Sequence, residues 1–254
     1  MTWHLGTAIG TLLYGLLVGS LVPMLIARVP EPEAETTGRA DAGDTVDAEA
    51  PAPVDEQTVE EPKELYADIA RLRRLRTFSS LATGVIGFIV GGAVGWNGGL
   101  YSLLYLAPVG VALAVIDWRT KLLPTKLIAP SYVAVIVLSV VAALSDNDRH
   151  ALVLAGVGWL VAGGTYFLLW FVYPRGMGYG DVRLSGVLGI ALGYLGWATL
   201  LTGVYAGFLL GGFGGLLLSL LKIVDRKANP FGPFMLVGAV VGVALGPLVA
   251  SWYS

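Results

Sequence analysis

Two aspartates are the residues of this sequence best placed to do chemistry. Of the 18 acidic residues, 13 lie together between Glu31 and Asp68, in a stretch rich in Pro, Ala and Thr. Asp117 instead closes an apolar run, and Asp181 opens another. A charged group at or within a membrane segment is costly and so marks a functional site. Asp117 and Asp181 are therefore our candidates for a catalytic pair.

Two carboxyl groups on different segments suit one kind of reaction if they meet. Like charges close together cannot both ionise easily, so the pair shares a proton. The ionised group can then take a proton from water while the protonated group polarises a peptide carbonyl. The result is amide hydrolysis without a covalent intermediate. It requires no cysteine, of which the chain has none, and no histidine, of which it has two far apart, His4 and His150.

Both aspartates also have purely structural explanations. An Asp at a helix start stabilises the helix dipole and can cap the first turn, which would suit Asp181. Asp117 could pair with Arg119 or Lys121 at a membrane surface. The placement of charge alone leaves these explanations open beside the catalytic one.

The composition points to a lipid bilayer as the main solvent of the protein. Of its 254 residues, 56% are hydrophobic and only 13% are charged, whereas a soluble domain is roughly half apolar and a quarter charged. Mean hydropathy is +0.73. The 35 glycines fit membrane helices, where they let backbones approach closely. With no cysteine in the sequence, disulfides, thiolate metal sites and cysteine nucleophiles are excluded.

Apolar runs indicate the elements that must position the two aspartates. A helix needs about 20 mostly apolar residues to span the hydrocarbon core. The runs are Leu5 to Ala27 and residues 78–95, 98–117, 126–145, 151–173, 181–194, 196–222 and 231–251. We expect an all-α polytopic membrane protein with about eight transmembrane helices. The first run has no Lys or Arg before it and exceeds the apolar part of a signal peptide, so we expect a retained helix.

The composition changes abruptly after the first run. Residues 29–62 are mostly Pro, Glu, Asp, Ala and Thr, which predicts disorder. The following sequence KELYADIARLRRLR places four apolar side chains near one face beside several Arg, which predicts an interfacial helix. The expected organisation is a first transmembrane helix (1–28), an acidic disordered cytoplasmic tether (29–62), an interfacial helix (63–77) and a seven-helix membrane core (78–254).

Basic residues predict the orientation. Residues 28–77, 117–126, 174–183 and 222–230 hold 15 of the 16 Lys and Arg, and Arg149 is the exception. Segments rich in Lys and Arg stay in the cytoplasm. We therefore expect both termini outside, and both aspartates at the cytoplasmic membrane surface.

The residues around each aspartate are distinctive. Asp181 ends the string GMGYGD, where Gly176, Gly178 and Gly180 permit a tight backbone, with positive φ if needed. The segment GMGYGDVRLSGVLGIALG resembles the GxGD signature of type IV prepilin peptidases. The segment IDWRTKLLP, with Asp117 followed by Pro124, resembles the other catalytic segment of that family. Near the ends of the chain, NPFGPFMLVGA and GSLVPMLIARVP also resemble family segments.

This resemblance implies a membrane aspartic endopeptidase of the bacterial inner membrane. Such enzymes remove a short basic leader from type IV prepilins or pseudopilins, cutting just before the apolar pilin helix. The resemblance makes Asp117 and Asp181 the catalytic pair and Gly176, Gly178, Gly180, Pro124 and Arg183 residues that shape the site or bind substrate. It implies no metal and no cofactor for the peptidase reaction. The expected partners are the substrate and membrane lipids, with no nucleic acid.

The chain also departs from the family pattern. Many members methylate the new N-terminus with S-adenosylmethionine, and these usually carry paired CxxC motifs in the first cytoplasmic loop. That loop has no cysteine here, so methyl transfer stays open. Arg183 stands where a Lys is common and keeps the positive charge. Arg119, Lys121, Arg175 and Arg183 could orient substrate, or could serve topology and lipid headgroups.

Two other functions could use a pair of membrane aspartates. Intramembrane GxGD proteases of the presenilin or signal-peptide-peptidase kind pair a YD motif with GxGD and carry a later PAL motif. This chain has Ile116 before Asp117, and PFGP in place of PAL. A transporter could use the two aspartates as proton or cation sites, but such sites usually lie near the bilayer midplane, whereas these aspartates lie at segment ends.

Overall fold

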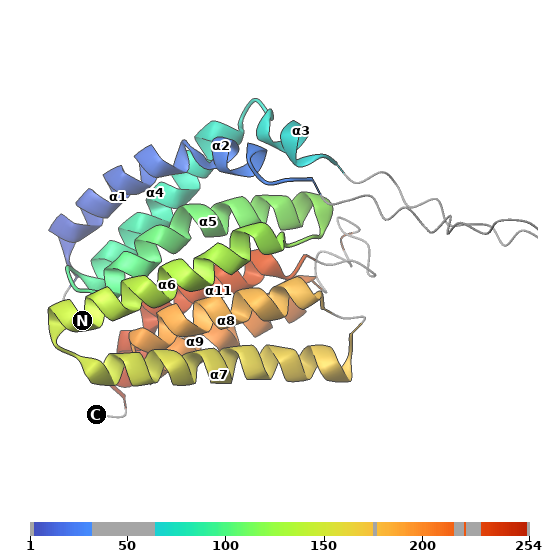
Figure 1. Cartoon of the computed structure of the whole chain (residues 1–254). Helices are drawn as coiled ribbons and strands as arrows, with labels where there is room; N and C mark the ends of the chain where they lie inside the picture. Colours follow the sequence, from blue (N-terminus) through green and yellow to red (C-terminus); the bar gives the residue numbers. More distant parts are fainter. Residues whose placement is uncertain (1–2, 32–63, 175–176, 216–220, 222–229, 253–254) are drawn as a thin grey trace, which may run out of the picture.

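The structure is a computed structural model that describes residues 3–31, 64–174, 177–215, 221 and 230–252. Most of these residues lie in helices (Figure 1). No strand occurs among these residues. The elements are α1 (Leu5–Gly19), α2 (Val22–Ala27), α3 (Tyr66–Ala70), α4 (Leu75–Val94), α5 (Gly99–Thr120), α6 (Thr125–Asp146), α7 (Arg149–Val172), α8 (Tyr179–Tyr194), α9 (Trp197–Leu209), the π-helix η1 (Leu210–Gly214) and α11 (Gly232–Ala250).

Six of the described helical segments are long and apolar enough to cross a membrane. They are α4, α5, α6, α7, α9 with η1, and α11, and α1 is a shorter apolar helix. With the buried helix α8, these segments account for the eight apolar runs. The expected all-α polytopic fold is confirmed. The chain is a multi-pass membrane protein.

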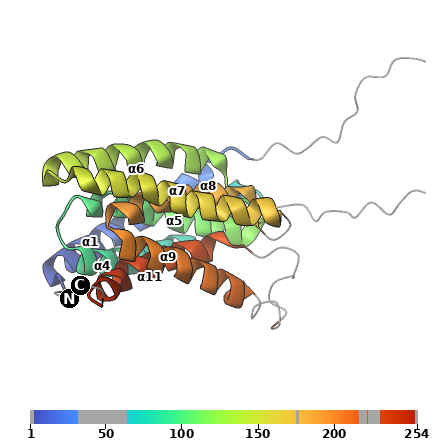
Figure 2. The same cartoon turned by 90° about the horizontal axis from the view of Figure 1, so that it is seen from below.

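Helices α5 and α8 occupy the centre of the bundle (Figures 1 and 2). In α5, 72% of the residues in its apolar 18-residue stretch are buried, against 22% to 39% in the corresponding stretches of the other five candidate spans. Nearly every residue of α8 is buried as well. These are the two helices that carry the candidate aspartates, so the protein surrounds both with its other helices.

Close backbone contacts join the helices in pairs. A Cβ on Gly15 of α1 would lie 2.4 Å from the Thr83 carbonyl oxygen of α4, and the Thr11 hydroxyl donates to the Gly87 carbonyl at 2.7 Å. A Cβ on Gly238 of α11 would lie 2.3 Å from the Gly207 nitrogen of α9. Small residues and hydroxyl bonds of this kind drive helix association in membranes, because lipid offers no hydrophobic gain between helices.

The N-terminal run differs from the single helix expected over Leu5 to Ala27. It divides into α1 and α2, with Ser20 and Leu21 between them. Pro23 lies at the start of α2. Proline fits the first turn of a helix but interrupts a helix interior, so it explains why a new helix starts there.

The interfacial helix expected over 63–77 is shorter than expected. Within this range α3 ends at Ala70, and α4 begins after a turn, at Leu75. Ile69 and Leu75 are buried, whereas Leu65 and Leu72 remain exposed. The turn between α3 and α4 lets Ile69 and Leu75 both pack inward. Of the tether predicted to be disordered, residues 29–62, all but residues 29–31 lie outside the described residues.

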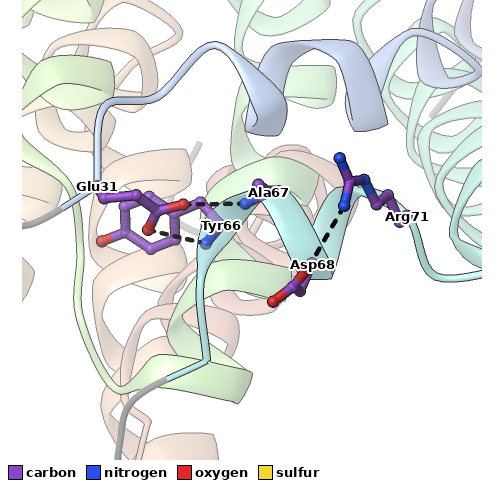
Figure 3. A network of polar contacts seen from close by, with 5 residues as sticks. All are labelled: Glu31, Tyr66, Ala67, Asp68 and Arg71. Carbon is purple, nitrogen blue, oxygen red and sulfur yellow. Dashed lines mark hydrogen bonds and ion pairs between the residues drawn. The ribbon is translucent and has the colours of Figure 1, made fainter.

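The start of α3 is held by an acidic side chain from the other side of the tether (Figure 3). The Glu31 carboxylate accepts hydrogen bonds from the backbone N–H groups of Tyr66 at 2.9 Å and Ala67 at 3.0 Å. These are helix-start donors that would otherwise lack partners. Burial, and then the Glu31 charge, raise the pKa of the Tyr66 hydroxyl, since both disfavour the tyrosinate. Glu31 thus ties the end of α2 to α3.

Candidate active site

Asp117 lies in the last turn of α5 with only 4% of its surface exposed. Its Oδ2 accepts a hydrogen bond from the backbone N–H of Gly232, at the start of α11, at 2.9 Å. No described residue donates to its other oxygen. Among the described residues, neither Arg119 nor Lys121 forms an ion pair with Asp117. Arg119 instead pairs with Glu64 at 2.8 Å.

Asp181 lies in the first turn of α8 and is 6% exposed. Its Oδ2 accepts a hydrogen bond from the backbone N–H of Gly178 at 3.1 Å. The helix-capping role considered for Asp181 is therefore real for one oxygen. Its Oδ1 is buried and has no hydrogen-bond partner among the described residues. Buried polar atoms nearly always have a partner, so this oxygen calls for a water, a shared proton or a substrate.

The end of α5, which carries Asp117, lies beside the start of α8, which carries Asp181. Leu123, in the turn after α5, contacts the backbone beside both aspartates. A Cβ on Gly180 would lie 2.7 Å from the Leu123 Cβ, and a Cβ on Gly232 would lie 3.5 Å from its Cδ1. The structure thus brings together two aspartates that are 64 positions apart in the sequence, each held through one oxygen by one backbone N–H.

The glycines before Asp181 provide space rather than unusual backbone angles. Gly178 has φ −74° and ψ 147°, and Gly180 lies within α8. Neither has the positive φ that the sequence allowed for; among described glycines only Gly95 and Gly196 do. Gly180 must lack a side chain because Leu123 packs against it. Gly176 lies outside the described residues.

Pro124 and Arg183 position the helices around the site. Pro124 has an extended backbone at the start of α6, and its carbonyl accepts the N–H of Leu127 at 3.0 Å. Arg183 donates to the Thr125 hydroxyl of α6, and its guanidinium lies 4.6 Å from the centroid of the Tyr179 ring. Arg183 therefore joins α8 to α6 and pairs with neither carboxylate. Of the other basic candidates, Arg175 lies outside the described residues.

The segment NPFGPFMLVGA was noted in the sequence, but no site role was predicted for its residues Phe231 and Gly232 at the start of α11. The N–H of Gly232 holds Asp117, and the preceding Phe231 anchors this segment. The Phe231 ring packs edge-on against Tyr166 of α7, with centroids 6.0 Å apart. A Cβ on Gly211 of η1 would lie 2.1 Å from this ring. The PFGP segment was the available signal, but nothing in it revealed which aspartate it contacts.

Comparison with known proteins connects this geometry to one family. The profile of the type IV leader peptidase family matches residues 104–220, which include both aspartates. Over these residues the chain is similar to the type IV leader peptidase family. Among leader peptidase relatives, the prepilin leader peptidase/N-methyltransferase of Aeromonas hydrophila is 32% identical over 170 residues, covering 63% of this chain and 54% of the relative. The protein of that name from Escherichia coli (strain K12) is 33% identical over 140 residues, covering 52% and 58%.

A third relative extends the comparison. The prepilin leader peptidase/N-methyltransferase of Stutzerimonas stutzeri is 29% identical over 176 residues, covering 68% of this chain and 59% of the relative. The chain therefore spans a little over half the length of the curated leader peptidases that it matches. No solved structure matches the chain.

Proposed function

We propose that this chain is an aspartic endopeptidase that removes the leader from type IV prepilins or pseudopilins. Asp117 and Asp181 would be its catalytic pair, at the cytoplasmic face of the bacterial inner membrane. One observation carries the proposal. Each carboxyl group is fixed by a backbone N–H through Oδ2, and the buried Oδ1 of Asp181 has no hydrogen-bond partner among the described residues.

The reaction follows from two carboxyl groups that hold one proton between them. The ionised carboxylate takes a proton from water as the water oxygen bonds to the carbonyl carbon of the scissile peptide. The protonated carboxyl group gives its proton to the carbonyl oxygen, which forms a neutral gem-diol. Transfer of a proton to the amide nitrogen then breaks the C–N bond and releases an acid and an amine. No bond forms between protein and substrate.

The fixed oxygens explain why the pair can act in a buried site. A carboxylate that must reorient during the reaction would lose part of the advantage of being prepositioned. Here the N–H of Gly178 and the N–H of Gly232 orient the two groups before substrate arrives. Among described residues no Lys or Arg forms an ion pair with either carboxylate, so no fixed cation holds both in the ionised form.

Single substitutions Asp117→Asn and Asp181→Asn test the proposal. We expect each to reduce leader removal from a co-expressed type IV prepilin below detection, since an amide can neither accept nor give the required proton. Cleavage is read from the mobility shift of the pilin, with the amount of each variant in the membrane measured alongside.

Asp146→Asn is a matched control. Asp146 also lies at a helix end and accepts a backbone N–H, that of Gly98 at 2.9 Å, but it ends α6 at the opposite end of the bundle from the pair. This variant should cleave as the unmodified chain does. Full activity in either of the other two variants would show that the pair is wrongly assigned.

The proposal does not include methyl transfer. S-adenosylmethionine carries a sulfonium and an ammonium, which acidic groups stabilise. Two of the cavities lined by described residues lack such groups: one has arginines as its only charged lining residues, and the other has no charged lining residue. Neither fits this cofactor, so we derive no step through it. Peptide hydrolysis by the two aspartates needs no cofactor.

A further inference from the structure

A large apolar groove lies along the bundle beside the proposed catalytic pair. Its volume is about 1010 Å³, and it is lined by α4, α5 and α11, with α8 beneath. We call it the lateral groove. Several of its side chains are strongly exposed, including Phe78 and Val85 of α4 and Val237 of α11, each more than half exposed. Because the chain is a membrane protein, these exposed apolar side chains face lipid.

The lateral groove reaches residues that neighbour the candidate site, although neither aspartate lines it. Its lining includes Trp118 and Pro233, the residues directly after Asp117 and Gly232, which are joined by the 2.9 Å hydrogen bond. Leu188, two turns after Asp181 on α8, forms part of the deeper lining. Both aspartate-bearing helices thus form walls of the groove, and the groove reaches the turn in which Asp117 lies.

Charge is confined to one end of the lateral groove. Its charged lining residues are Arg73, Arg74 and Arg119. Arg73 and Arg74 immediately precede α4, and Arg119 lies two residues after Asp117. All other lining residues are apolar. The groove is therefore polar at the level of the candidate site and hydrocarbon-like along the rest of its length.

The length of the lateral groove suits a helix. Along α5 the lining extends from Leu103 to Arg119. These 16 steps correspond to about 24 Å at 1.5 Å per residue. That is most of the roughly 30 Å hydrocarbon core, so an apolar helix could lie in the groove across nearly the whole membrane. One lipid tail reaches only through its own leaflet, about half that depth.

We propose that the lateral groove receives the apolar helix of the substrate, entering sideways from the bilayer. This inference rests on the proposed function. The helix would pack against α4, α5 and α11, with its cytoplasmic end at the turn that carries Asp117. The peptide bond preceding the helix is then delivered to Asp117. Binding of the helix, rather than recognition of the leader alone, sets which bond is cut.

Disulfide trapping tests this placement. Because the sequence has no cysteine, an introduced cysteine is the only thiol in the protein. Val85→Cys and Val237→Cys place a thiol in the groove at residues that are 55% and 52% exposed. Val137→Cys places one on α6, outside the groove, at a residue that is 53% exposed. Each is combined with Asp117→Asn and incubated, in membranes with a copper–phenanthroline oxidant, with a type IV prepilin carrying one cysteine in its apolar helix.

We expect cross-linked product from Val85→Cys and Val237→Cys, at least about tenfold above Val137→Cys. Equal yields at all three positions, or none in the groove, would overturn the inference, the latter leaving lipid as the occupant of the groove. A second measurement uses Val237→Trp with the aspartates intact. It should raise the KM for full-length prepilin at least about tenfold with kcat maintained, whereas Val137→Trp should not. Unchanged KM in Val237→Trp would also contradict the groove.

Failure of the groove and failure of the proposed function give different results. If the unmodified chain cleaves prepilin but no groove thiol is trapped, the catalytic proposal stands and the docking inference is wrong. If the unmodified chain does not cleave prepilin, the proposed function is wrong and the docking inference fails with it.

Discussion

At the residue scale, the two carboxyl oxygens of each aspartate have different roles. One oxygen of Asp117 and one of Asp181 accept a backbone N–H, which fixes the side chain. The remaining oxygen of Asp181 is buried and has no hydrogen-bond partner in the part of the chain that the structure describes, a state that costs free energy unless a ligand or water binds there. The structural and catalytic explanations of these residues are therefore compatible, because they concern different atoms of one side chain.

The residue whose substitution most directly tests this arrangement is Gly232. In Gly232→Ala the new Cβ would lie 2.8 Å from Asp117 Oδ2, so the carboxylate must move and its hydrogen bond must weaken. Hydrogen bonds to charged groups are worth roughly 1.5–3 kcal/mol, so we expect cleavage to fall by about 10- to 100-fold. The measurement is the initial rate of leader removal by purified protein.

Gly164→Ala is the control, since nothing lies within 4 Å of a Cβ added on that helical glycine of α7. It should leave the rate of leader removal unchanged. A Gly232→Ala variant as active as this control would mean that the Gly232 hydrogen bond does not position Asp117.

At the element scale, the site depends on how closely α7 and α8 approach. A Cβ on Gly158 would lie 2.2 Å from the Gly189 carbonyl oxygen, and one on Gly189 would lie 2.4 Å from the Gly158 carbonyl oxygen. Gly193 is equally close to the Leu154 carbonyl, at 2.5 Å. Glycines in register along both helices let α8, the helix that starts with Asp181, lie against the backbone of α7.

Gly189→Ala should therefore destabilise the protein even though alanine favours helices. The gain in helix propensity is about 1 kcal/mol, whereas forcing a methyl group into packed backbone costs roughly 1–3 kcal/mol and separates α7 from α8. We expect a lower midpoint of thermal unfolding in detergent. Gly156→Ala, on the open side of α7, should leave the midpoint unchanged or raise it. The reverse order of the two midpoints would exclude tight α7–α8 packing.

The short helix α3 depends on Glu31. Glu31→Ala removes the acceptor for the backbone N–H groups of Tyr66 and Ala67, so α3 should open more often. We expect hydrogen exchange of these two amides to accelerate by about tenfold or more, given roughly 1.5–3 kcal/mol for a bond to a charged group. Arg71→Gln serves as the comparison. Its ion pair with Asp68 joins side chains that are 82% and 65% exposed, so its loss should leave the two exchange rates unchanged.

At the scale of the whole molecule, the two ends of the bundle differ in charge. The described chain ends lie together at one end, whereas the end of α5 and the starts of α8 and α11 lie at the other (Figure 1). The connections between helices alternate between the two ends. The described Lys and Arg, apart from Arg149, lie at the second end. We infer from this asymmetry that the aspartate-bearing end faces the cytoplasm.

Labelling of single cysteines tests this orientation in living cells. Trp96→Cys lies in the turn between α4 and α5, at a residue that is 78% exposed, and Lys126→Cys lies at the exposed start of α6. A membrane-impermeant maleimide should label Trp96→Cys in intact cells. It should label Lys126→Cys only after the membrane is permeabilised. Labelling in the opposite pattern would invert the proposed topology and place the aspartates outside.

The sequence by itself predicted most of the helices and drew attention to the two aspartates. Runs of apolar residues depend only on neighbours along the chain, so the expected helices from 78–95 onward begin and end close to those observed, except that the run 196–222 passes through η1 into undescribed residues. Rare charges at the edges of such runs likewise identified Asp117 and Asp181 without any knowledge of contacts.

Tertiary structure decided how these residues are held and what lies beside them. The bond between Gly232 and Asp117 joins residues 115 positions apart, and the sequence does not encode such a pairing in any local pattern. The same holds for Arg183, whose charge suggested a role in orienting substrate but whose side chain contacts Thr125 and Tyr179. The lateral groove likewise arises from helices that are distant in the sequence. Contacts between distant segments depend on packing, which a one-dimensional pattern does not contain.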